Sequence, residues 1–310
     1  MKYCFGVDLG GTTVKMGLFS SEGEILEKWE IPTRREEHGA YILPDIAASI
    51  HEKCSLKNLG KEEIIGVGIG VPAPVDQRGI VKGTVNLGWG YKNVKEELEE
   101  LTGLRVKVGN DANMAALGEM WLGAGKGEPN LIMLTLGTGV GGGILVDGVP
   151  LVGTHGAGGE VGHMKVNLDE KRVCGCGKRG CLEQYASATG IAYLAEKRLA
   201  ENDDPTPLRD FDKVTAKEVF DCLKAGDSVA EDVVETFGRY LGMGIANIAA
   251  VCDPTVAIIG GGVSKAGPIL LDYVKKYYQE YVFFADKDLQ FVLAELGNDA
   301  GICGAAKLVL

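Results

Sequence analysis

Hydrophobic residues fall into short blocks at the start of the chain, each bounded by glycine or polar residues. The blocks at residues 3–9, 13–19 and 25–31 have the length and composition of β-strands. Tight turns at Gly10-Gly11 and at Ser21-Glu22-Gly23 separate these blocks. The pattern therefore predicts three consecutive strands joined by short turns.

The rest of the chain alternates between helical periodicity and short apolar blocks, which predicts an α/β protein. The expected helices lie near residues 39–59, 92–103, 112–124, 267–280 and 299–309, and helices dominate 181–252. The expected strands lie near residues 64–71, 104–109, 131–136, 140–146, 255–260 and 290–294. Within 229–252, one helix face collects Val229, Val233, Phe237, Leu241, Ile248 and Cys252.

Two strand–glycine turn–strand units resemble each other within the chain. The first covers Val7 to Thr13 and the second covers Leu134 to Val140. Each unit opens one half of the β/α pattern. The repetition predicts two related lobes with a ligand between them.

Length and charge narrow the class of protein. A chain of 310 residues fits about two domains of ordinary size, and 45% hydrophobic residues suffice for a large core. The net charge of −11 argues against nucleic acid as a partner.

The longest apolar run, Leu131 to Val146, contains five glycines and two threonines, so no membrane span is expected. The first residues lack the apolar stretch of a signal peptide, which favours a cytoplasmic location.

The glycine turns are candidates for binding phosphate. Gly137-x-Gly139-x-x-Gly142 matches the dinucleotide fingerprint, but a strand follows it where that fingerprint requires a helix. A plain hairpin is the alternative explanation for one such turn. Because two turns occur, both with hydroxyl residues and one with Asp8, phosphate binding is favoured.

Three cysteines and a histidine have the spacing of a structural zinc site. Cys174, Cys176 and Cys181 lie in a polar, glycine-rich loop, and His163 precedes Cys174 by eleven residues. Three thiolates and one imidazole form a closed tetrahedral Zn²⁺ site. Three unrelated thiols, or a disulfide with a spare cysteine, are the alternatives.

Carboxylates near this loop suit a substrate with many hydroxyl groups. Glu160 and Glu183 flank the cluster, and Asn110-Asp111 starts a predicted helix. Carboxylate and amide oxygens accept hydrogen bonds from sugar hydroxyls. Taken singly, Asp111 could be a helix cap, His163 a metal ligand only, and both glutamates solvated charges.

Taken together, the chain resembles the ROK family of sugar kinases and repressors, and within it the bacterial ATP-dependent glucokinases. The resemblance covers nearly the whole chain. Its motifs are Asp8-Leu9-Gly10-Gly11-Thr12 with Lys15, Asn86-Leu87-Gly88-Trp89, Asn110-Asp111-Ala112-Asn113, Leu136-Gly137-Thr138-Gly139, Glu160-Val161-Gly162-His163-Met164, Cys174 to Glu183, and Gly260-Gly261-Gly262.

The resemblance implies a two-lobe, actin-like ATPase fold of the ribonuclease-H-like type, with duplicated β/α lobes and a cleft between them. The small lobe would cover residues 1–111 with the C-terminal helix 298–310 packed back on it. The large lobe would cover 112–297 and carry the zinc loop and the dimerisation surface. A homodimer or homotetramer and a role in glycolysis are also implied.

The resemblance further implies transfer of a phosphoryl group from ATP, with Mg²⁺, to the 6-hydroxyl of glucose. Asp111 would be the general base. The sugar would be bound by Asn86, Asn110, Asp111, Glu160, His163 and Glu183. The nucleotide and its magnesium would be bound by Asp8, Gly10, Gly11, Thr12, Lys15, Gly137, Thr138, Gly139, Gly261 and Gly262. His163 would have one ring nitrogen on zinc and the other facing the sugar.

Several alternatives stay open at this point. The substrate could be another hexose, or an N-acetylhexosamine such as N-acetylmannosamine or N-acetylglucosamine, and the donor could be ADP or polyphosphate. A sugar-binding protein without catalysis is an alternative from a different class. Transcription regulators of the family carry a helix-turn-helix before the first glycine motif, whereas Asp8 is here the eighth residue.

Overall fold

The structure, a computed structural model, describes residues 2–84 and 86–310. The chain divides into two compact units. Unit 1 comprises Met1–Pro129, Gly143–Gly159 and Glu295–Leu310, and unit 2 comprises Asn130–Gly142 and Glu160–Ala294. The chain thus returns twice to unit 1, and its last helix belongs there.

The sheet of unit 1 has five strands in the order β3-β2-β1-β4-β7. Their bounds are β1 Tyr3–Leu9, β2 Thr13–Ser20, β3 Ile25–Pro32, β4 Ile64–Val71 and β7 Val106–Asn110. The first three strands pair antiparallel, whereas β1, β4 and β7 pair in parallel. The three consecutive strands expected at the start of the chain are confirmed.

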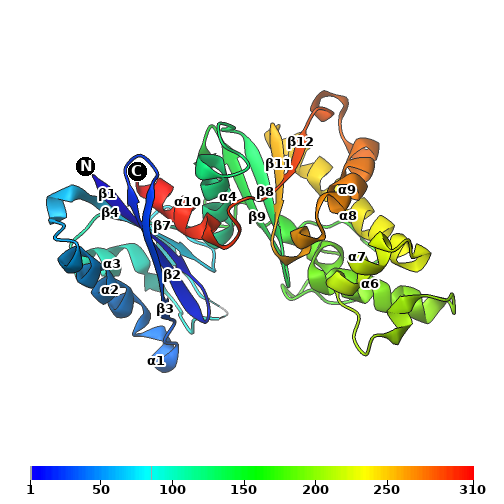
Figure 1. Cartoon of the computed structure of the whole chain (residues 1–310), viewed down its shortest axis with the longest axis horizontal. Helices are drawn as coiled ribbons and strands as arrows, with labels where there is room; N and C mark the ends of the chain where they lie inside the picture. Colours follow the sequence, from blue (N-terminus) through cyan, green and yellow to red (C-terminus); the bar gives the residue numbers. More distant parts are fainter. Residues whose placement is uncertain (1, 85) are drawn as a thin grey trace. The chain divides into compact units, whose positions relative to one another are not determined.

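Helices cover both faces of this sheet, as Figure 1 shows. They are α2 Ile42–Leu56, α3 Val94–Thr102, α4 Asp111–Leu122 and α10 Ala300–Val309, and the four-residue α1 Glu36–Gly39 lies between β3 and α2 in the chain. Smaller elements are the strand pair β5 Ile80–Val81 and β6 Lys92–Asn93 and the 3₁₀ turns Lys61–Glu63 and Gly297–Asp299. Side chains along β1 point alternately to the two faces of the sheet. Phe5 packs in the core with α2, and Cys4 packs on the other face with α10.

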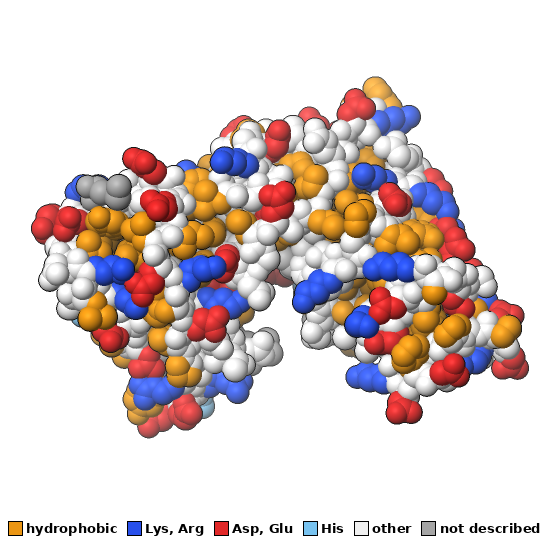
Figure 2. Space-filling view, in the orientation of Figure 1, with side chains coloured by type: hydrophobic (Ala, Val, Ile, Leu, Met, Phe, Trp, Pro, Cys, Tyr) orange, Lys and Arg blue, Asp and Glu red, His pale blue; other side chains and the backbone are white. Residues whose placement is uncertain are grey.

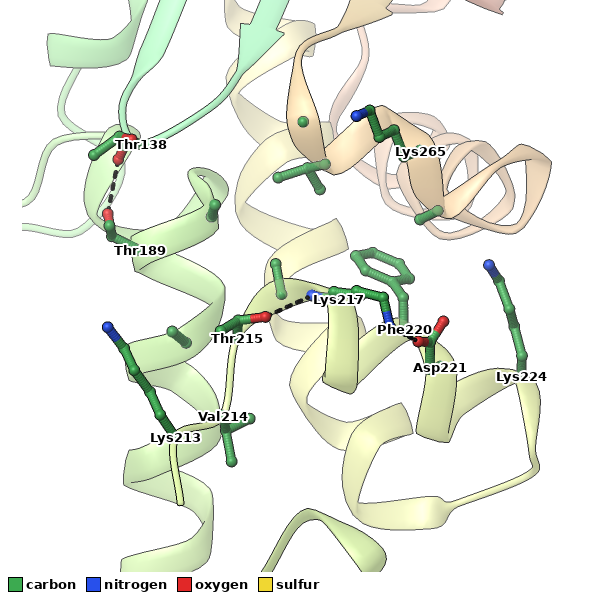
Figure 3. A pocket seen from close by; sticks show the side chains of 16 residues that line it. Thr138, Thr189, Lys213, Val214, Thr215, Lys217, Phe220, Asp221, Lys224 and Lys265 are labelled. Atoms are coloured by element: carbon green, nitrogen blue, oxygen red, sulfur yellow. Dashed lines mark hydrogen bonds and ion pairs between the residues drawn. The ribbon is translucent and has the colours of Figure 1, made fainter. Parts of the chain in front are cut away.

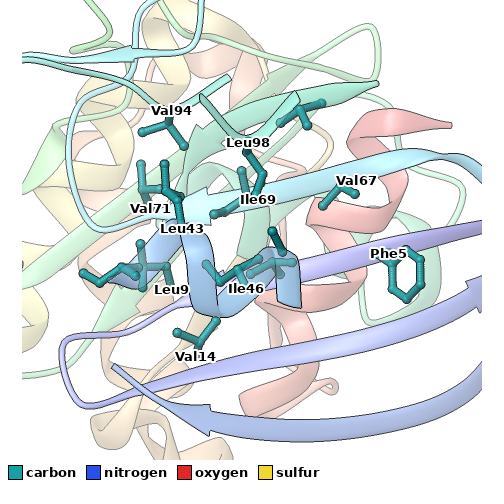
Figure 4. Packing of buried hydrophobic residues seen from close by; sticks show 14 of the residues in the cluster. Phe5, Leu9, Val14, Leu43, Ile46, Val67, Ile69, Val71, Val94 and Leu98 are labelled. Atoms are coloured by element: carbon teal, nitrogen blue, oxygen red, sulfur yellow. The ribbon is translucent and has the colours of Figure 1, made fainter. Parts of the chain in front are cut away.

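Figure 4 shows the core on the α2 and α3 side of the sheet. Leu43 and Ile46 from α2 and Leu98 from α3 lie over Val67 and Ile69 of β4, and all five are fully or almost fully buried. On the other face, α10 approaches the strands so closely that a Cβ on Gly6 would lie 2.0 Å from the backbone oxygen of Ile302. Glycine on β1 therefore lets this helix pack directly against the sheet.

The second sheet has the order β10-β9-β8-β11-β12. Its strands are β8 Leu131–Leu136, β9 Val140–Val146, β10 Val149–Pro150, β11 Val256–Gly260 and β12 Gln290–Leu293. β8, β11 and β12 run parallel to one another. The chain passes from unit 2 to unit 1 inside β9, between Gly142 and Gly143.

The helices of unit 2 lie in the second half of the sequence. They are α5 Glu183–Ala186, α6 Ala188–Glu201, α7 Ala216–Lys224, α8 Ser228–Cys252 and α9 Pro268–Tyr281, with 3₁₀ turns at Val161–His163, Pro207–Asp210, Gly262–Ala266 and Phe284–Asp286. Asp227 caps α8 by accepting a hydrogen bond from the backbone N of Ala230. The predicted apolar face of α8 is buried at Val229, Val233, Phe237, Leu241 and Ile248.

The surface is mixed in charge. Figure 2 shows acidic and basic side chains interspersed over the visible face. No helix among the residues that the structure describes is long and apolar enough to cross a membrane.

Candidate functional site

The four predicted metal ligands come together in unit 2. The ligand atoms of His163, Cys174, Cys176 and Cys181 all lie within 4.8 Å of one another. The sulfurs of Cys176 and Cys181 are 3.6 Å apart, and Nδ1 of His163 lies 3.8 Å from the Cys174 sulfur. A tetrahedral zinc ion with Zn–S bonds of about 2.3 Å spaces its sulfurs about 3.8 Å apart. The donor set and its spacing therefore fit Zn²⁺.

The loop around these ligands supports the fit. None of the eight cysteines is paired in a disulfide, so the sulfurs of Cys174, Cys176 and Cys181 are available as ligands. A tight turn forms because the backbone N of Cys174 donates to the oxygen of Lys178 at 2.7 Å. Nζ of Lys165 donates to the sulfur of Cys181 at 2.8 Å. Three thiolates around Zn²⁺ carry one net negative charge, which the ammonium group of Lys165 offsets.

Glu160 and His163 are positioned by the 3₁₀ turn Val161–His163, which begins directly after Glu160. A Cβ on Gly162 would lie 2.2 Å from the backbone oxygen of Val140, so glycine lets the turn pack onto the start of β9. Because Nδ1 of His163 faces the metal cluster, Nε2 is left for a second contact. Glu160 is exposed.

Glu183 joins the metal cluster to the second glycine turn. It is the first residue of α5 and follows Cys181 by two positions. Its Oε2 accepts a hydrogen bond from the backbone N of Val140 at 3.1 Å. Its Oε1 lies 3.5 Å from the sulfur of Cys174. The carboxylate is thus held by the first residue after the turn Gly137–Gly139.

A polar network behind α5 holds this short helix in place. Oε1 of Gln184 accepts a hydrogen bond from the backbone N of Cys181, and Nε2 of Gln184 donates to the oxygen of Arg172. Arg172 donates to Glu170 at 2.6 Å and stacks over the ring of Tyr193 at 3.3 Å. Sequence reasoning missed this network, because charged residues in a polar loop look like solvated ones.

The same network shifts the pKa values of Glu170 and Tyr185. Burial alone would raise the pKa of Glu170, but hydrogen bonds from Arg172 and from the hydroxyl of Tyr185 outweigh it and lower this pKa to about 2. Burial and the hydrogen bond to Glu170 raise the pKa of Tyr185. Glu170 therefore stays ionised beside Arg172 throughout the neutral range.

The second glycine turn lies against two neighbouring segments of unit 2. Within the turn, Gly137 N donates to Gly139 O at 3.0 Å, and the backbone N of Ala188 donates to Gly137 O at 2.8 Å. Gly261 has a φ of +83°, and a Cβ there would lie 2.6 Å from backbone atoms of Leu136. Only glycine meets both conditions. The predicted nucleotide residues Gly137, Gly139 and Gly261 are therefore brought together.

A cavity of about 510 Å³ opens beside this turn (Figure 3). The predicted nucleotide residues Thr138 and Gly262 line it. Its other walls come from α6, α7, the segment just before α7 and the 3₁₀ turn Gly262–Ala266, and they include Val214, Phe220 and Val263. Apolar walls with a few polar groups are typical of a site for a small organic ligand.

Four lysines surround this cavity, and sequence reasoning missed them. They are Lys213, Lys217, Lys224 and Lys265. Figure 3 shows Lys217 and Lys224 on α7, Lys213 on the segment before it and Lys265 on the turn Gly262–Ala266, around the apolar side chains. Lys217 is paired with Asp221 at 2.7 Å. The positive charges suit an anionic ligand such as a nucleotide, and their concentration around 213–224 was the available sequence signal.

The first glycine turn lies in unit 1, between β1 and β2. The backbone N of Gly10 donates to the oxygen of Thr13 at 3.0 Å. The hydroxyl of Thr33 donates to Gly10 O at 2.8 Å. The predicted residues Gly11 and Thr12 follow in the same turn, with Thr12 exposed. This geometry holds the turn from both sides.

Asp8 and Lys15 lie opposite each other on β1 and β2. Burial raises the pKa of Asp8, and the positive charge of Lys15 partly opposes this effect. Nζ of Lys15 donates to the backbone oxygen of Asn298 at 3.5 Å. A half-buried carboxylate at the end of a strand is a suitable partner for a hydrated Mg²⁺ ion.

Asn110 is the residue that caps α4. Its Oδ1 accepts hydrogen bonds from the backbone N of Ala112 at 2.9 Å and of Asn113 at 3.3 Å. Its Nδ2 donates to the oxygen of Ala73 at 3.2 Å. Asp111 is the first helical residue and is exposed, and its Oδ1 also accepts from Ala112 N at 2.8 Å. The helix start is therefore held by Asn110, which leaves Asp111 at a positive helix end.

The remaining predicted residue, Asn86, lies beside the first glycine turn. A Cβ built on Gly11 would be 3.5 Å from the Cβ of Asn86. Asn86 is exposed. Asn86, Asn110 and Asp111 thus belong to unit 1, whereas Glu160, His163 and Glu183 belong to unit 2.

Comparison with known proteins defines the family. The chain matches the model of the ROK family over residues 4–310. This chain belongs to the ROK family, and the resemblance expected from its motifs is confirmed.

Individual relatives are similar over the full length. A protein of Halalkalibacterium halodurans named glucokinase is 45% identical, and the alignment covers 99% of this chain and 95% of that protein. The crystal structure of a ROK hexokinase from Thermus thermophilus has a TM-score of 0.83 at 32% identity, with 98% and 96% of the two chains covered. A ROK glucokinase from Streptomyces griseus, solved with glucose and AMPPNP, has a TM-score of 0.76 at 34% identity, with 99% and 98% covered. The expected actin-like two-lobe fold of ROK sugar kinases is thereby confirmed.

Proposed function

We propose that this chain is a glucokinase, which transfers the γ-phosphoryl group of ATP to the 6-hydroxyl of glucose. The observation that carries the proposal is the exposed carboxylate of Asp111 at the start of α4, in a chain that is 45% identical to a glucokinase. The lysine-lined cavity beside Thr138 supports a nucleotide as the donor.

In the proposed reaction, Asp111 accepts the proton of the sugar 6-hydroxyl. The hydroxyl oxygen then forms a bond to the γ-phosphorus, and the bond from that phosphorus to the bridging oxygen of ADP breaks. Phosphoryl transfer depends mostly on positioning and on charge stabilisation. General base catalysis of this kind contributes about 10²–10⁴-fold.

The sugar is assigned to carboxylates, amides and one imidazole. Its hydroxyl groups form hydrogen bonds with the side chains of Asn86, Asn110, Glu160, His163 and Glu183. In His163 the ring nitrogen Nε2 faces the sugar, since Nδ1 is directed at the metal cluster. Fixing one nitrogen on a metal fixes the ring orientation.

The phosphates and metals are assigned to the two glycine turns and the cysteine loop. Phosphate groups are assigned to the first turn, with Gly10, Gly11, Thr12 and the neighbouring Lys15, and to the second turn, with Gly137, Thr138 and Gly139. The adenosine part of the nucleotide is assigned to Gly261 and Gly262. Asp8 holds Mg²⁺, which offsets negative charge on the phosphates. His163, Cys174, Cys176 and Cys181 hold a structural Zn²⁺. A homodimer or homotetramer is expected in solution.

The test is a substrate panel with purified protein. MgATP is offered with glucose, mannose, fructose, N-acetylglucosamine and N-acetylmannosamine, and ADP release is measured. Turnover that strongly favours glucose supports the proposal. Preference for an acetylated sugar would transfer the assignment to a hexosamine kinase. The absence of turnover on every sugar, in protein that contains zinc and with polyphosphate also tried, would contradict the proposal and favour a non-catalytic sugar-binding protein.

A further inference from the structure

The segment that follows the last cysteine of the metal cluster runs along the second glycine turn. Its first contact is the bond from Val140 N to Glu183 Oε2. A Cβ on Gly139 would lie 2.2 Å from the same carboxylate oxygen, so Glu183 sits directly against the turn. Through this oxygen the carboxylate acts on the backbone of the turn.

The second contact is made by hydroxyl groups at the start of α6. Thr189 Oγ1 donates to the backbone oxygen of Thr138 at 2.8 Å. Thr189 also shares a hydrogen bond of 2.9 Å with the hydroxyl of Ser187, which accepts from the backbone N of Gly190 at 2.9 Å. Because Thr189 gives its proton to Thr138, the chain runs from Gly190 through Ser187 and Thr189 to Thr138. Linked hydrogen bonds of this kind polarise and strengthen one another.

The second contact lies where the cavity begins. Thr138, Ala188 and Thr189 line it, and Figure 3 shows the bond between the two threonines at its edge. The turn contains two glycines and would be mobile without external restraint, because glycine loses the most conformational freedom when ordered. A turn fixed before the ligand arrives binds it with less loss of entropy.

We propose that Glu183 and Thr189 are positioning residues for the nucleotide, which they serve by holding the turn Gly137–Val140. Glu183 then has a function in nucleotide binding that is separate from its contact with the sugar. The inference rests on the proposed function for the identity of the nucleotide. It assigns to the segment Glu183–Thr189 the task of fixing the phosphate turn from the side of the metal cluster.

The experiment measures nucleotide binding in the absence of sugar, where a pure sugar ligand has no effect. The affinity of the full-length protein for AMPPNP with Mg²⁺ is determined by isothermal titration calorimetry. Loss of one hydrogen bond at the turn predicts an affinity about three- to tenfold lower for Thr189→Val. Thr189→Ser keeps the hydroxyl and is expected to retain affinity within about twofold of wild type.

Glu183 is tested with two variants. Glu183→Ala removes the acceptor for Val140 N and is expected to weaken AMPPNP binding about three- to tenfold. Glu183→Gln keeps an amide oxygen at the same place, so its AMPPNP affinity is expected to exceed that of the alanine variant. Zinc content and melting temperature are measured on the same samples, so that loss of the metal or of the fold is detected.

The outcomes separate this inference from the proposed function. Wild-type affinity for AMPPNP in both Thr189→Val and Glu183→Ala would overturn it. A selective loss of nucleotide affinity in folded Thr189→Val, with rescue by serine and unchanged hexose affinity, would support it. If the wild-type protein phosphorylates no hexose while the Thr189 and Glu183 variants still lose AMPPNP affinity, the glucokinase assignment is contradicted and the inference stands.

Discussion

The Cα atom of Gly301 lies against the carboxylate of Asp8. A Cβ added to Gly301 would be 2.7 Å from Cγ of Asp8 and 2.8 Å from its Oδ2. Gly301 belongs to the first turn of α10, which packs on β1 within unit 1. The C-terminal helix therefore leaves room for the carboxylate that we assign to magnesium.

This contact predicts the effect of Gly301→Ala. The added methyl group must displace the Asp8 side chain or move α10, so kcat/KM for MgATP is expected to fall by up to about a hundredfold. Overpacking is expected to cost about 1–3 kcal/mol of stability. Steady-state kinetics at several Mg²⁺ concentrations and urea unfolding check both parts. Gly83→Ala is the matched control, since a Cβ there meets nothing within 4 Å, and unchanged kinetics in Gly301→Ala would contradict the placement of Asp8.

Asp111→Ala is expected to lose about 10²–10⁴-fold in kcat while it still binds the sugar. The fold should tolerate the change, because Asn110 and not Asp111 caps α4. Rapid-quench or coupled assays give kcat, and calorimetry gives the sugar affinity. Turnover near the wild-type rate would show that another group takes the proton.

Much of the fold could be predicted from the sequence because its blocks are clearly bounded. The predicted strand 64–71 coincides with β4, and the helix expected at 112–124 is α4 Asp111–Leu122. The start of α4 was readable because Asn110 is a side chain that caps helices by a local hydrogen bond. A cap of this type can be recognised in the sequence, because the capping residue and the start of the helix are neighbours in the chain.

Contacts between distant segments could not be predicted in the same way. The 3₁₀ turns and the strand pair β5 and β6 are too short to give a periodic pattern. The network of Glu170, Arg172 and Tyr185 depends on burial of charged groups, and nothing in a single sequence distinguishes these from solvated ones. The cavity lysines were missed because α7 and the turn Gly262–Ala266 meet only in the folded chain.

Cys176→Ser is expected to lose most of the bound zinc. Cys176 is the exposed ligand of the cluster, and three remaining ligands do not complete a closed site. Sugar affinity should fall by at least about tenfold, because His163 is itself a predicted ligand and Glu160 and Glu183 lie within three residues of predicted ligands in the chain. Metal analysis by mass spectrometry and a glucose titration measure the two effects. Cys54→Ser, which changes a half-buried thiol outside the cluster, is the control, and full zinc content in Cys176→Ser would refute the ligand set.

The lowered pKa of Glu170 predicts how the free energy of unfolding depends on pH. Its pKa is lowered from an ordinary value of 4.5 to about 2 in the folded protein. A lowered carboxyl pKa means that the folded state binds this proton less readily than the unfolded state does. The resulting stabilisation is complete above about pH 4.5 and is lost as the pH falls toward 2.

The variant Glu170→Gln removes this titration, along with the charge that pairs with Arg172. We expect the variant to be less stable than wild type at pH 7, with a difference that shrinks steadily between pH 4.5 and pH 2. Urea unfolding at a series of pH values measures the difference directly, and comparison at each pH cancels the general loss of stability in acid. Asp169→Asn, which alters the exposed carboxylate next to Glu170, is the matched control. A difference that stays constant over this range would mean that Glu170 does not hold its charge through Arg172 and Tyr185, and that α5 is positioned by other contacts.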